Sequence, residues 1–219
     1  MSLVYDCADP AERVAGLAAA VSAVRRGELV VLPTDTVYGL GADAFAPAAV
    51  AVLRVAKARG RDLPLSVLVG SWRALDGLAL FVPSTVRDLV EAFWPGALTL
   101  VVEHAPSLAW DLGDARGTVA VRMPLHPVAL ELLGETGPMA VSGANRAGQA
   151  PATTVGEARA QLGAVVAVYL DGGPSGEPIQ STIVDTTTPV PRVLRPGAVS
   201  LDELRAVNPA VEPAEQQEE

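Results

Sequence analysis

The apolar residues of this chain recur first at helical spacing and then at strand spacing. Helical spacing runs over residues 11–26, at Val14, Leu17, Ala18, Val21 and Val24. Gly27 ends this predicted helix, and the apolar run 29–32 predicts a buried strand that ends at Pro33. We expect a polar, glycine-rich loop next, and then a helix that starts at Pro47 and carries Lys57 at its end.

The same alternation continues to about residue 207. Helices are predicted at 85–93, with Ser84 as the cap, and after Pro127. Capping-box spacing predicts two more helix starts, at Thr154 with Glu157 and at Ser200 with Glu203. Strands are predicted at 65–69, 98–102, 118–122, 139–142, 165–170, 182–185 and 192–194.

Strands that alternate with helices predict an α/β fold, and the close spacing of the last strands predicts a mixed sheet. We expect one domain over residues 1–207. The polar, acidic segment 208–219 predicts a disordered tail.

Charge and composition narrow the function. The formal net charge is -9, which argues against a broad nucleic-acid-binding surface. Cys7 is the only cysteine, and the two histidines lack ligand spacing, so we expect no disulfide and no protein-held metal. The sequence shows neither a secretory pattern at its start nor a membrane-spanning apolar run, which predicts a cytoplasmic location.

Polar clusters follow the predicted strands, where open α/β sheets gather their ligand sites. Each cluster also has a purely structural explanation. Lys57 and Arg59 lie at a helix end, where the macrodipole favours cations. Arg122, in a valine-rich strand, either pairs with a carboxylate or faces a cleft. Arg195 is followed by Pro-Gly and fits a turn, and Thr36 suits turn backbone.

Two common nucleotide-binding motifs fit poorly. Without a Gly-Lys-Ser/Thr sequence the chain is not a P-loop NTPase. Residues 39–44 match the loose dinucleotide fingerprint Gly-x-Gly-x-x-Ala. Five residues, 34–38, separate these glycines from the end of the strand, whereas the dinucleotide fold places them in the strand–helix turn.

Taken in order, the polar clusters resemble the YrdC family over residues 15–206. The similarity is carried by Pro33-Thr-Asp-Thr-Val-Tyr-Gly-Leu40, Lys57-Ala-Arg59 with Pro64-Leu65, Trp94-Pro-Gly-Ala-Leu-Thr99, Val119-Ala-Val-Arg-Met-Pro124, Ala144-Asn-Arg-Ala-Gly148, Asp171-Gly-Gly173, Ser181-Thr-Ile-Val-Asp185 and Leu194-Arg-Pro-Gly197. The resemblance implies a twisted mixed sheet flanked by helices, with a deep cationic groove. The chain resembles the short form of the family, which lacks an additional C-terminal domain.

The resemblance also implies an activity, that of an L-threonylcarbamoyladenylate synthase, which is a nucleotidyltransferase. Such an enzyme condenses L-threonine, bicarbonate and ATP, with Mg²⁺, to threonylcarbamoyl-AMP and pyrophosphate. A separate transferase complex then modifies the tRNA adenosine beside the anticodon, so we expect weak or no direct tRNA binding here.

Motif positions imply the roles of individual residues. Lys57 and Arg59 would face the carbamate and the phosphates as catalytic residues. Threonine contacts are implied for Thr36, Arg122 and Ser181. Nucleotide contacts are implied for Arg59, Thr118, Asn145, Thr153 and Arg195.

Three positions depart from the family pattern. Gly143 replaces a common serine, and Leu63 and Leu68 replace polar residues of some relatives, so no ligand contact is inferred for the two leucines. Two alternative functions stay open at this point. One is a non-catalytic RNA-binding or ribosome-assembly module that uses the same groove. The other is a carbamoyl-transfer domain like that of hydrogenase maturation proteins.

Overall fold

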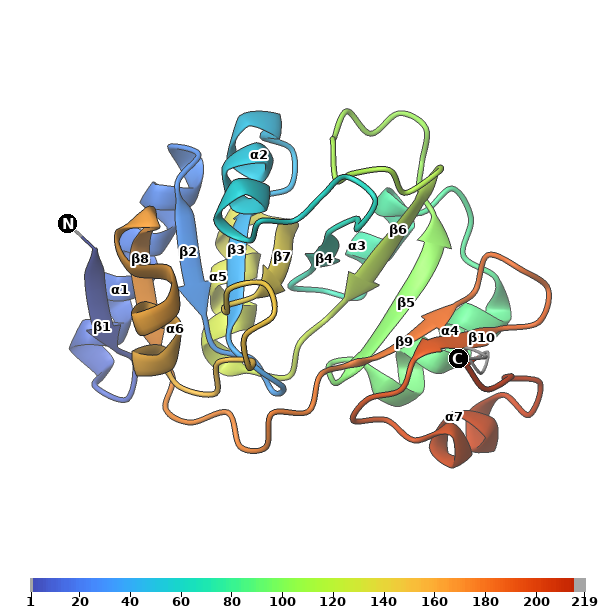
Figure 1. Ribbon diagram of the computed structural model, residues 1–219. Helices are drawn as coiled ribbons and strands as arrows, with labels where there is room; N and C mark the ends of the chain where they lie inside the picture. Colours follow the sequence, from blue (N-terminus) through green and yellow to red (C-terminus); the bar gives the residue numbers. More distant parts are fainter. Residues whose placement is uncertain (1, 215–219) are drawn as a thin grey trace.

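One twisted mixed sheet runs through the described part of the chain, residues 2–214 of the computed structural model (Figure 1). Its strands are β1 (Leu3–Asp6), β2 (Leu29–Leu32), β3 (Gly39–Asp43), β4 (Ser66–Leu68), β5 (Leu98–Glu103), β6 (Thr118–Arg122), β7 (Met139–Gly143), β8 (Val166–Asp171), β9 (Thr182–Asp185) and β10 (Arg192–Arg195). The helices are α1 (Pro10–Arg25), α2 (Pro47–Ala56), α3 (Ala74–Leu78), α4 (Ser84–Phe93), α5 (Pro127–Thr136), α6 (Val155–Leu162) and α7 (Leu201–Val207), with a short 3₁₀ turn at Gly163–Val165.

The strand order is β1-β8-β2-β3-β7-β4-β6-β5-β9-β10. Strand β8 is parallel to both β1 and β2, whereas β3 is antiparallel to β2 and β7. In the other half, β4 is parallel to β6, β5 is antiparallel to β6 and parallel to β9, and β10 folds back antiparallel to β9. The predicted mixed α/β sheet is therefore confirmed.

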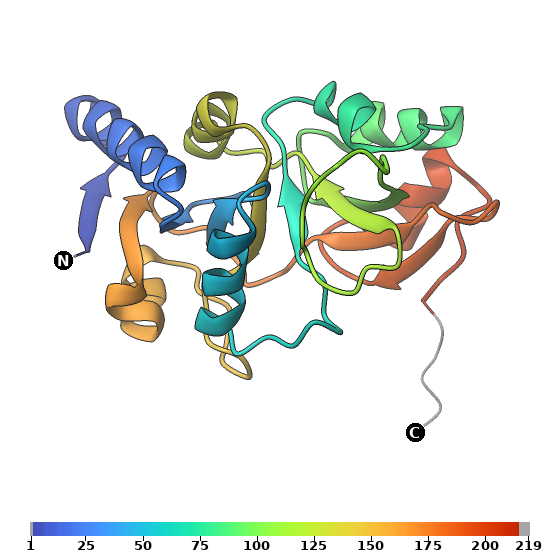
Figure 2. The same cartoon turned by 90° about the horizontal axis from the view of Figure 1, so that it is seen from above.

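Helices cover the two faces of the sheet unequally. Figure 2 shows α1, α5, α3 and α4 along one face, and α2 with α6 on the other. In Figure 1, α2 and α6 lie in front of the strands at the N-terminal end of the order, and the front of β4, β6 and β5 carries no helix. The fully helix-covered side holds much of the core, with Val67, Leu100 and Val121 all buried.

Two of the predicted helix starts are confirmed, and both have a complete capping box. Thr154 and Ser200 each accept the backbone N–H of the glutamate three residues later, and each glutamate bonds back to the cap. Ser84 does not cap its helix: it is the first residue of α4, Pro83 occupies the cap position, and no side chain caps that helix. Strand β1 and helix α3 were not predicted from the sequence, because both are very short.

The glycine-rich segment after β2 is a strand rather than the predicted loop. Gly39 and Gly41 belong to β3, where side chains from the neighbouring strands lie over them. A Cβ on Gly41 would come within 2.7 Å of Met139 Cε, and one on Gly39 within 3.0 Å of Val141 Cγ1. These glycines admit close side-chain packing in an antiparallel strand, so the segment is no strand–helix phosphate turn.

Residues 208–214, which the sequence assigned to a disordered tail, are part of the fold. Val211 is fully buried in the main core, and Glu212 forms an ion pair with Arg192 at 2.8 Å. The backbone of Glu212 also bonds to Pro191 and Val193. Residues 208–214 thus continue the fold beside β10, and the rest of the predicted tail, 215–219, lies outside the described residues.

Candidate functional site: a cavity lined by cations and hydroxyls

A cavity of about 550 Å³ opens on the face of the sheet that lacks a helix over β4, β6 and β5. Strand alternation explains which side chains line it, because residues i and i+2 share a face. Ser66 with Leu68, Ala120 with Arg122, and Thr99 with Val101 all face the cavity. The residues between them point into the helix-covered core.

Four cations line the cavity, and the described lining contains no aspartate or glutamate. They are Lys57, Arg59, Arg122 and Arg195. Burial lowers the pKa of each. The charge of Arg59 further lowers the pKa of Lys57, and the charges of Arg122 and Arg59 lower that of Arg195. The deep cationic groove stays a prediction, and these four side chains are the cations that would form it.

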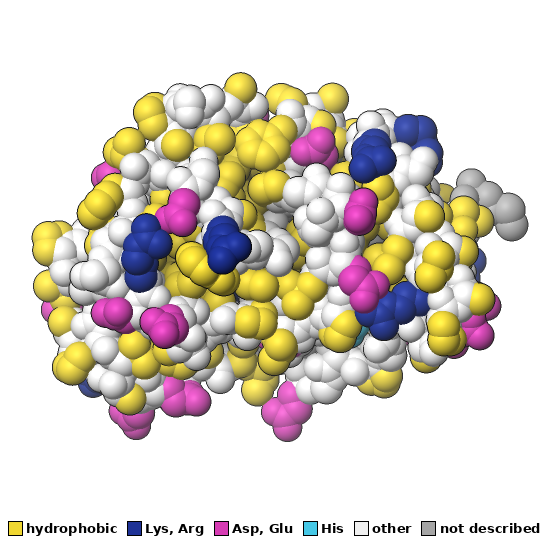
Figure 3. Space-filling model, turned by 180° about the vertical axis from the view of Figure 1, so that it is seen from behind, with side chains coloured by type: hydrophobic (Ala, Val, Ile, Leu, Met, Phe, Trp, Pro, Cys, Tyr) yellow, Lys and Arg dark blue, Asp and Glu magenta, His cyan; other side chains and the backbone are white. Residues whose placement is uncertain are grey.

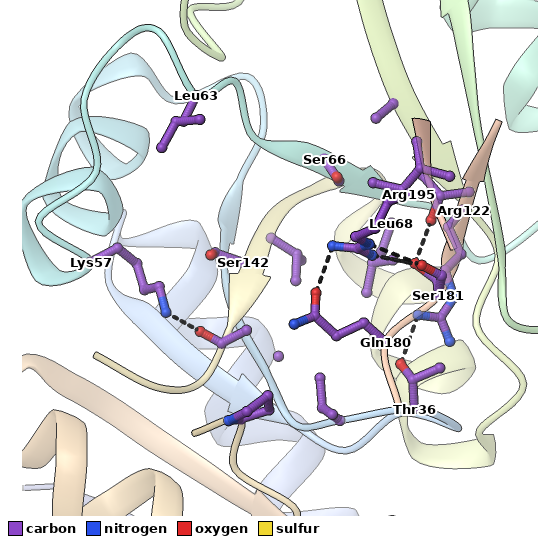
Figure 4. Close-up of a pocket in the computed structure, with 18 of the residues that line it drawn as sticks. Thr36, Lys57, Leu63, Ser66, Leu68, Arg122, Ser142, Gln180, Ser181 and Arg195 are labelled. Carbon is purple, nitrogen blue, oxygen red and sulfur yellow. Dashed lines mark hydrogen bonds between the residues drawn. The ribbon is translucent and has the colours of Figure 1, made fainter. Parts of the chain in front are cut away.

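Lys57 lies just beyond the last turn of α2, on one wall of the cavity (Figure 4). Its Nζ donates to the carbonyl oxygens of Gly143, at 2.7 Å, and Asn145, and to Asn145 Oδ1 at 3.1 Å. These acceptors are neutral, so they orient the ammonium group without cancelling its charge. Burial lowers the pKa of Lys57 to about 8.

Arg59 lies in the loop that follows α2. Its Nε donates to the Leu63 carbonyl at 2.7 Å, and its Nη2 donates to the Pro64 carbonyl at 2.9 Å. The loop therefore wraps around its own arginine. As at Lys57, the acceptors are neutral oxygens, and the guanidinium keeps its charge.

Arg122 both pairs with a carboxylate and faces the cavity. The sequence offered these as alternatives, and the structure shows both. Its Nη2 lies 2.5 Å from Asp35 Oδ1, and its Nη1 donates to Thr36 Oγ1 at 2.8 Å. Nε donates to the Gly96 carbonyl at 2.9 Å. Asp35 lies behind the arginine and also accepts the backbone N–H of Leu125. The pair fixes Arg122 in place against the loop between β2 and β3.

Ser181 and Arg195 form a second polar group beside Arg122 (Figure 4). Arg195 Nη2 donates to the Ser181 carbonyl at 2.7 Å and to its Oγ at 3.1 Å, and Nη1 donates to Gln180 Oε1 at 2.5 Å. Ser181 Oγ lies 2.8 Å from Thr99 Oγ1. Arg195 thus lies with Ser181, a predicted threonine contact, rather than with Asn145.

The structure brings together seven of the nine predicted site residues. Thr118 and Thr153 do not line the cavity. The Thr118 hydroxyl donates to the Ala115 carbonyl, and the Thr153 hydroxyl donates to the carboxylate of Glu157. Their assignment as nucleotide contacts stays a prediction that this geometry does not support.

Sequence reasoning missed several polar residues of the site, among them Asp35, Thr99, Gln180 and Ser142. Asp35 and Thr99 lie inside the quoted motifs and Gln180 directly precedes one, so position in or beside a motif was the available signal. Leu63 and Leu68 do line the cavity.

Gly143 shows no left-handed φ, and a Cβ there would come within 2.7 Å of Asn145 Oδ1. The closeness of Asn145 Oδ1, rather than a special backbone angle, explains why position 143 carries a glycine.

Residues 2–214 also bear on metal binding and on membrane-spanning helices. No group of three or more His, Cys, Asp or Glu side chains there is placed to hold a metal ion. Likewise, none of the helices described combines the length and apolar character needed to cross a membrane.

Fold and cavity define a mixed α/β protein that offers cations and hydroxyls to a small anionic ligand. The family model Sua5/YciO/YrdC, described as Telomere recombination, matches residues 22–197. A Mycobacterium leprae protein, provisionally named threonylcarbamoyl-AMP synthase, is 61% identical over 207 residues, 94% of each chain. The threonylcarbamoyl-AMP synthase of Bacillus subtilis is 38% identical, over 87% of this chain and 56% of its own. The chain belongs to the Sua5/YciO/YrdC family.

Solved structures agree with this membership. Pyrococcus abyssi Sua5 in complex with L-threonine superimposes with a TM-score of 0.88 at 32% identity, covering 97% of this chain and 62% of that one. Escherichia coli YciO, at 24% identity and a TM-score of 0.81, covers 93% of this chain and all of that one, and shows the same fold.

Proposed function

We propose that this protein is an L-threonylcarbamoyladenylate synthase, and therefore a nucleotidyltransferase. The observation that carries the proposal is the cavity, in which Lys57, Arg59, Arg122 and Arg195 gather around buried hydroxyls without a carboxylate in the described lining. The names of the relatives and the threonine complex of Pyrococcus abyssi Sua5 support it.

The reaction explains why such a lining is needed. The amine of L-threonine takes up bicarbonate-derived CO₂ to give a carbamate. A carbamate oxygen then attacks the α-phosphorus of ATP, a P–O bond forms, and pyrophosphate leaves with the electron pair of the broken P–O bond. Both reactants are anions, so catalysis rests on positioning and on charge neutralisation by preorganised cations.

The proposal assigns the two ends of the cavity to different parts of the reaction. Arg122 with Thr36 and Ser181 binds threonine, the arginine facing its carboxylate. Lys57 lies on the opposite wall (Figure 4) and, with the cavity-lining Arg59, faces the carbamate and the phosphates in this proposal. Asn145 lies next to Lys57 and contacts the nucleotide. Arg195 interacts electrostatically with both groups, because the charges of Arg122 and Arg59 each lower its pKa.

Mg²⁺ enters the proposal as the partner of ATP. The cavity provides hydroxyl and carbonyl oxygens but no lining carboxylate, so the residues fit a metal that is carried by phosphate oxygens. When bound, Mg²⁺ neutralises phosphate charge. The product passes to a separate transferase complex, and a cytoplasmic location is part of the same proposal.

One experiment tests the function directly. Pyrophosphate release is measured with L-threonine, bicarbonate and ATP together and with each omitted in turn, using ¹³C-bicarbonate and mass spectrometry to follow the product. We expect release only with all three, and a threonylcarbamoyl-AMP mass that is one unit heavier with the label. Release that is independent of threonine or of bicarbonate would refute the proposal.

The RNA-binding alternative has less support. Seen from behind, basic side chains are scattered among acidic and apolar ones (Figure 3). The cavity, in turn, is too small to take a folded RNA. The alternative of a carbamoyl-transfer domain rests on HypF structures, which are at most 20% identical and therefore share the fold alone.

A further inference from the structure

A second cavity, of about 470 Å³, lies beside α2. We call it the outer cavity; it is lined by Ala51, Arg54 and Val55 of α2, by the loop after the helix, and by Asp111 from the β5–β6 connection. Ala58 and Arg59 line both this cavity and the site described above. Apart from these two residues, its lining belongs to no quoted motif and to no step of the proposed reaction.

Arg54 is the feature of the outer cavity that calls for an explanation. The residue is only 8% exposed, and its Nη1 donates to the Leu112 carbonyl at 3.3 Å. Its Nη2 is buried and has no hydrogen-bond partner in residues 2–214. A buried donor of a charged group without an acceptor is costly, so such groups are nearly always paired with protein, water or ligand.

The carboxylate of the outer cavity is already committed to another arginine. Asp111 holds Arg61 in a bidentate ion pair, with both N–O distances at 2.8 Å, and Asp114 accepts from Arg61 Nε at 3.1 Å. Neither Arg54 nor Arg59 has an ion pair within the described part of the chain. Neither guanidinium is therefore ion-paired among the described residues, although the carboxylates of Asp62 and Asp111 lie close enough to act on their charges.

The pKa of Arg59 reflects these neighbours. Burial lowers it most, the charge of Arg54 lowers it further, and the charge of Asp62 raises it. Nε and Nη2 of Arg59 donate to the carbonyls of Leu63 and Pro64. Its third nitrogen, Nη1, has no hydrogen bond among the described residues. An anion beside Arg54 and Arg59 would relieve both the repulsion and the unpaired donors.

We propose that the outer cavity binds a small inorganic oxyanion of the phosphate class, held by Arg54 and Arg59. Phosphate and pyrophosphate share the tetrahedral oxygens that guanidinium groups bind in bidentate fashion. Because Arg59 lines both cavities, the bound anion and the ligands of the inner site share one side chain. The proposal concerns anion binding alone and holds whether or not the proposed reaction is correct.

Nuclear magnetic resonance of the full chain locates the binding. Inorganic phosphate is titrated while two sets of signals are followed. The Val55 amide and the Arg54 Nε–H report the outer cavity, and the Ser142 and Gly143 amides report the inner one. We expect saturable shifts at Val55 and Arg54. Sodium chloride at matched ionic strength is expected to leave them in place.

The decisive variant is Ala51→Glu, which puts a carboxylate one helical turn before Arg54. We expect it to occupy the place of the anion and to weaken the phosphate response of the outer signals at least tenfold. Val52→Glu is the matched control: it makes the same charge change on the same helix, and Val52 does not line the outer cavity. It is expected to keep the wild-type response.

Two further arms complete the test. Pyrophosphate is titrated in the same way, and a tighter response than that to phosphate identifies the larger anion as the preferred ligand. Arg54→Met keeps the buried stem, removes the unpaired donor and is expected to abolish the response while the protein remains folded. The proposal is overturned if phosphate and pyrophosphate both leave the outer signals unmoved, if chloride moves them equally, or if Ala51→Glu responds like the wild type.

Discussion

At the residue scale, the cations of the inner cavity are held by groups that leave their charge intact. Lys57 and Arg59 donate to neutral oxygens, and Arg122 alone pairs with a carboxylate, Asp35, which lies outside the lining. Fixed donors of this kind stabilise developing negative charge without reorganising during the reaction. The predictions for single residues follow from this arrangement.

Lys57→Ala and Arg59→Ala are expected to lose most turnover and to remain folded. A charged hydrogen bond is worth about 1.5–3 kcal/mol, which corresponds to a rate loss of about tenfold to a hundredfold or more. Pyrophosphate release measures the effect. Arg25→Ala is the matched control, because Arg25 also ends a helix but lies outside the cavity. Near-normal turnover in either variant would remove that residue from the site.

Lys57 also predicts a pH dependence of stability. Its pKa is about 8 in the fold and about 10.5 in an unfolded chain, so the unfolded state holds more protons between these values. Stability from this group therefore rises with pH between about 8 and 10.5. Urea unfolding of the wild type and of Lys57→Met from pH 7 to 10.5 isolates the effect. A difference between the two proteins that does not change with pH would contradict the assigned pKa.

Gly143→Ser is a test of the position where the family commonly has serine. From the sequence alone, a serine hydroxyl there would be a substrate contact that lowers the Michaelis constant for threonine by roughly threefold to tenfold. In the structure the new Cβ would crowd Asn145 Oδ1, an acceptor of Lys57. We now expect kcat/KM to fall by about threefold to tenfold, the effect of one weakened hydrogen bond. Gly143→Ala is the control, since it adds the Cβ without the hydroxyl, and equal losses in both would assign the effect to crowding.

At the element scale, the cavity results from unequal covering of the sheet. Strands β4, β5 and β6 each present one apolar face to helices and one mixed face to the cavity, so a single set of strands builds both core and site. Loops at the strand ends, after β2 and before β9, add Thr36 and Ser181. Strand β10 and the segment that follows α7 close the far edge of this half.

The C-terminal segment gives a prediction at this scale. Deleting residues 209–219 was expected from the sequence to have almost no effect. Val211 is fully buried, however, and full burial of a valine is worth about 1.5–3 kcal/mol. We therefore expect the deletion to lower the free energy of unfolding by at least that amount, as measured in urea. Deletion of 215–219 alone, which keeps Val211 and Glu212, is the control and should match the full chain.

At the scale of the whole molecule, charge is divided between the cavity and the rest of the protein. The net charge is -9, although four of the 16 basic residues line one cavity. The negative surface repels polyanions, while the cavity attracts small ones. Under the proposed function, the cavity would admit small anions, whereas the negative surface disfavours nucleic acid.

Direct tRNA binding is accordingly expected to be weak. At physiological salt we expect a dissociation constant no tighter than about 10⁻⁴ M, the weak end of non-specific binding. Fluorescence anisotropy with labelled tRNA measures it, with a basic tRNA-binding protein as the positive control. Binding that is a hundredfold tighter would show a polyanion-binding surface that the charge distribution does not predict.

The sequence by itself determined most of the element types, the mixed α/β class and the polar motifs at strand ends. It did so because these features are local: apolar periodicity, capping boxes at Thr154 and Ser200, and polar motifs at strand ends all act within a few residues. The family resemblance assigned roles to motif positions, and the structure placed most of those residues in one cavity.

Tertiary structure alone decided the features that depend on contacts between distant segments. The glycines at 39 and 41 form a strand because β2 and β7 lie on either side of them. Asp35 pairs with Arg122 across 87 positions, and Val211 is buried only because the end of the chain returns to β10. Thr118 and Thr153 point elsewhere for the same reason. Local patterns fix what a segment can form, whereas long-range packing fixes what it faces.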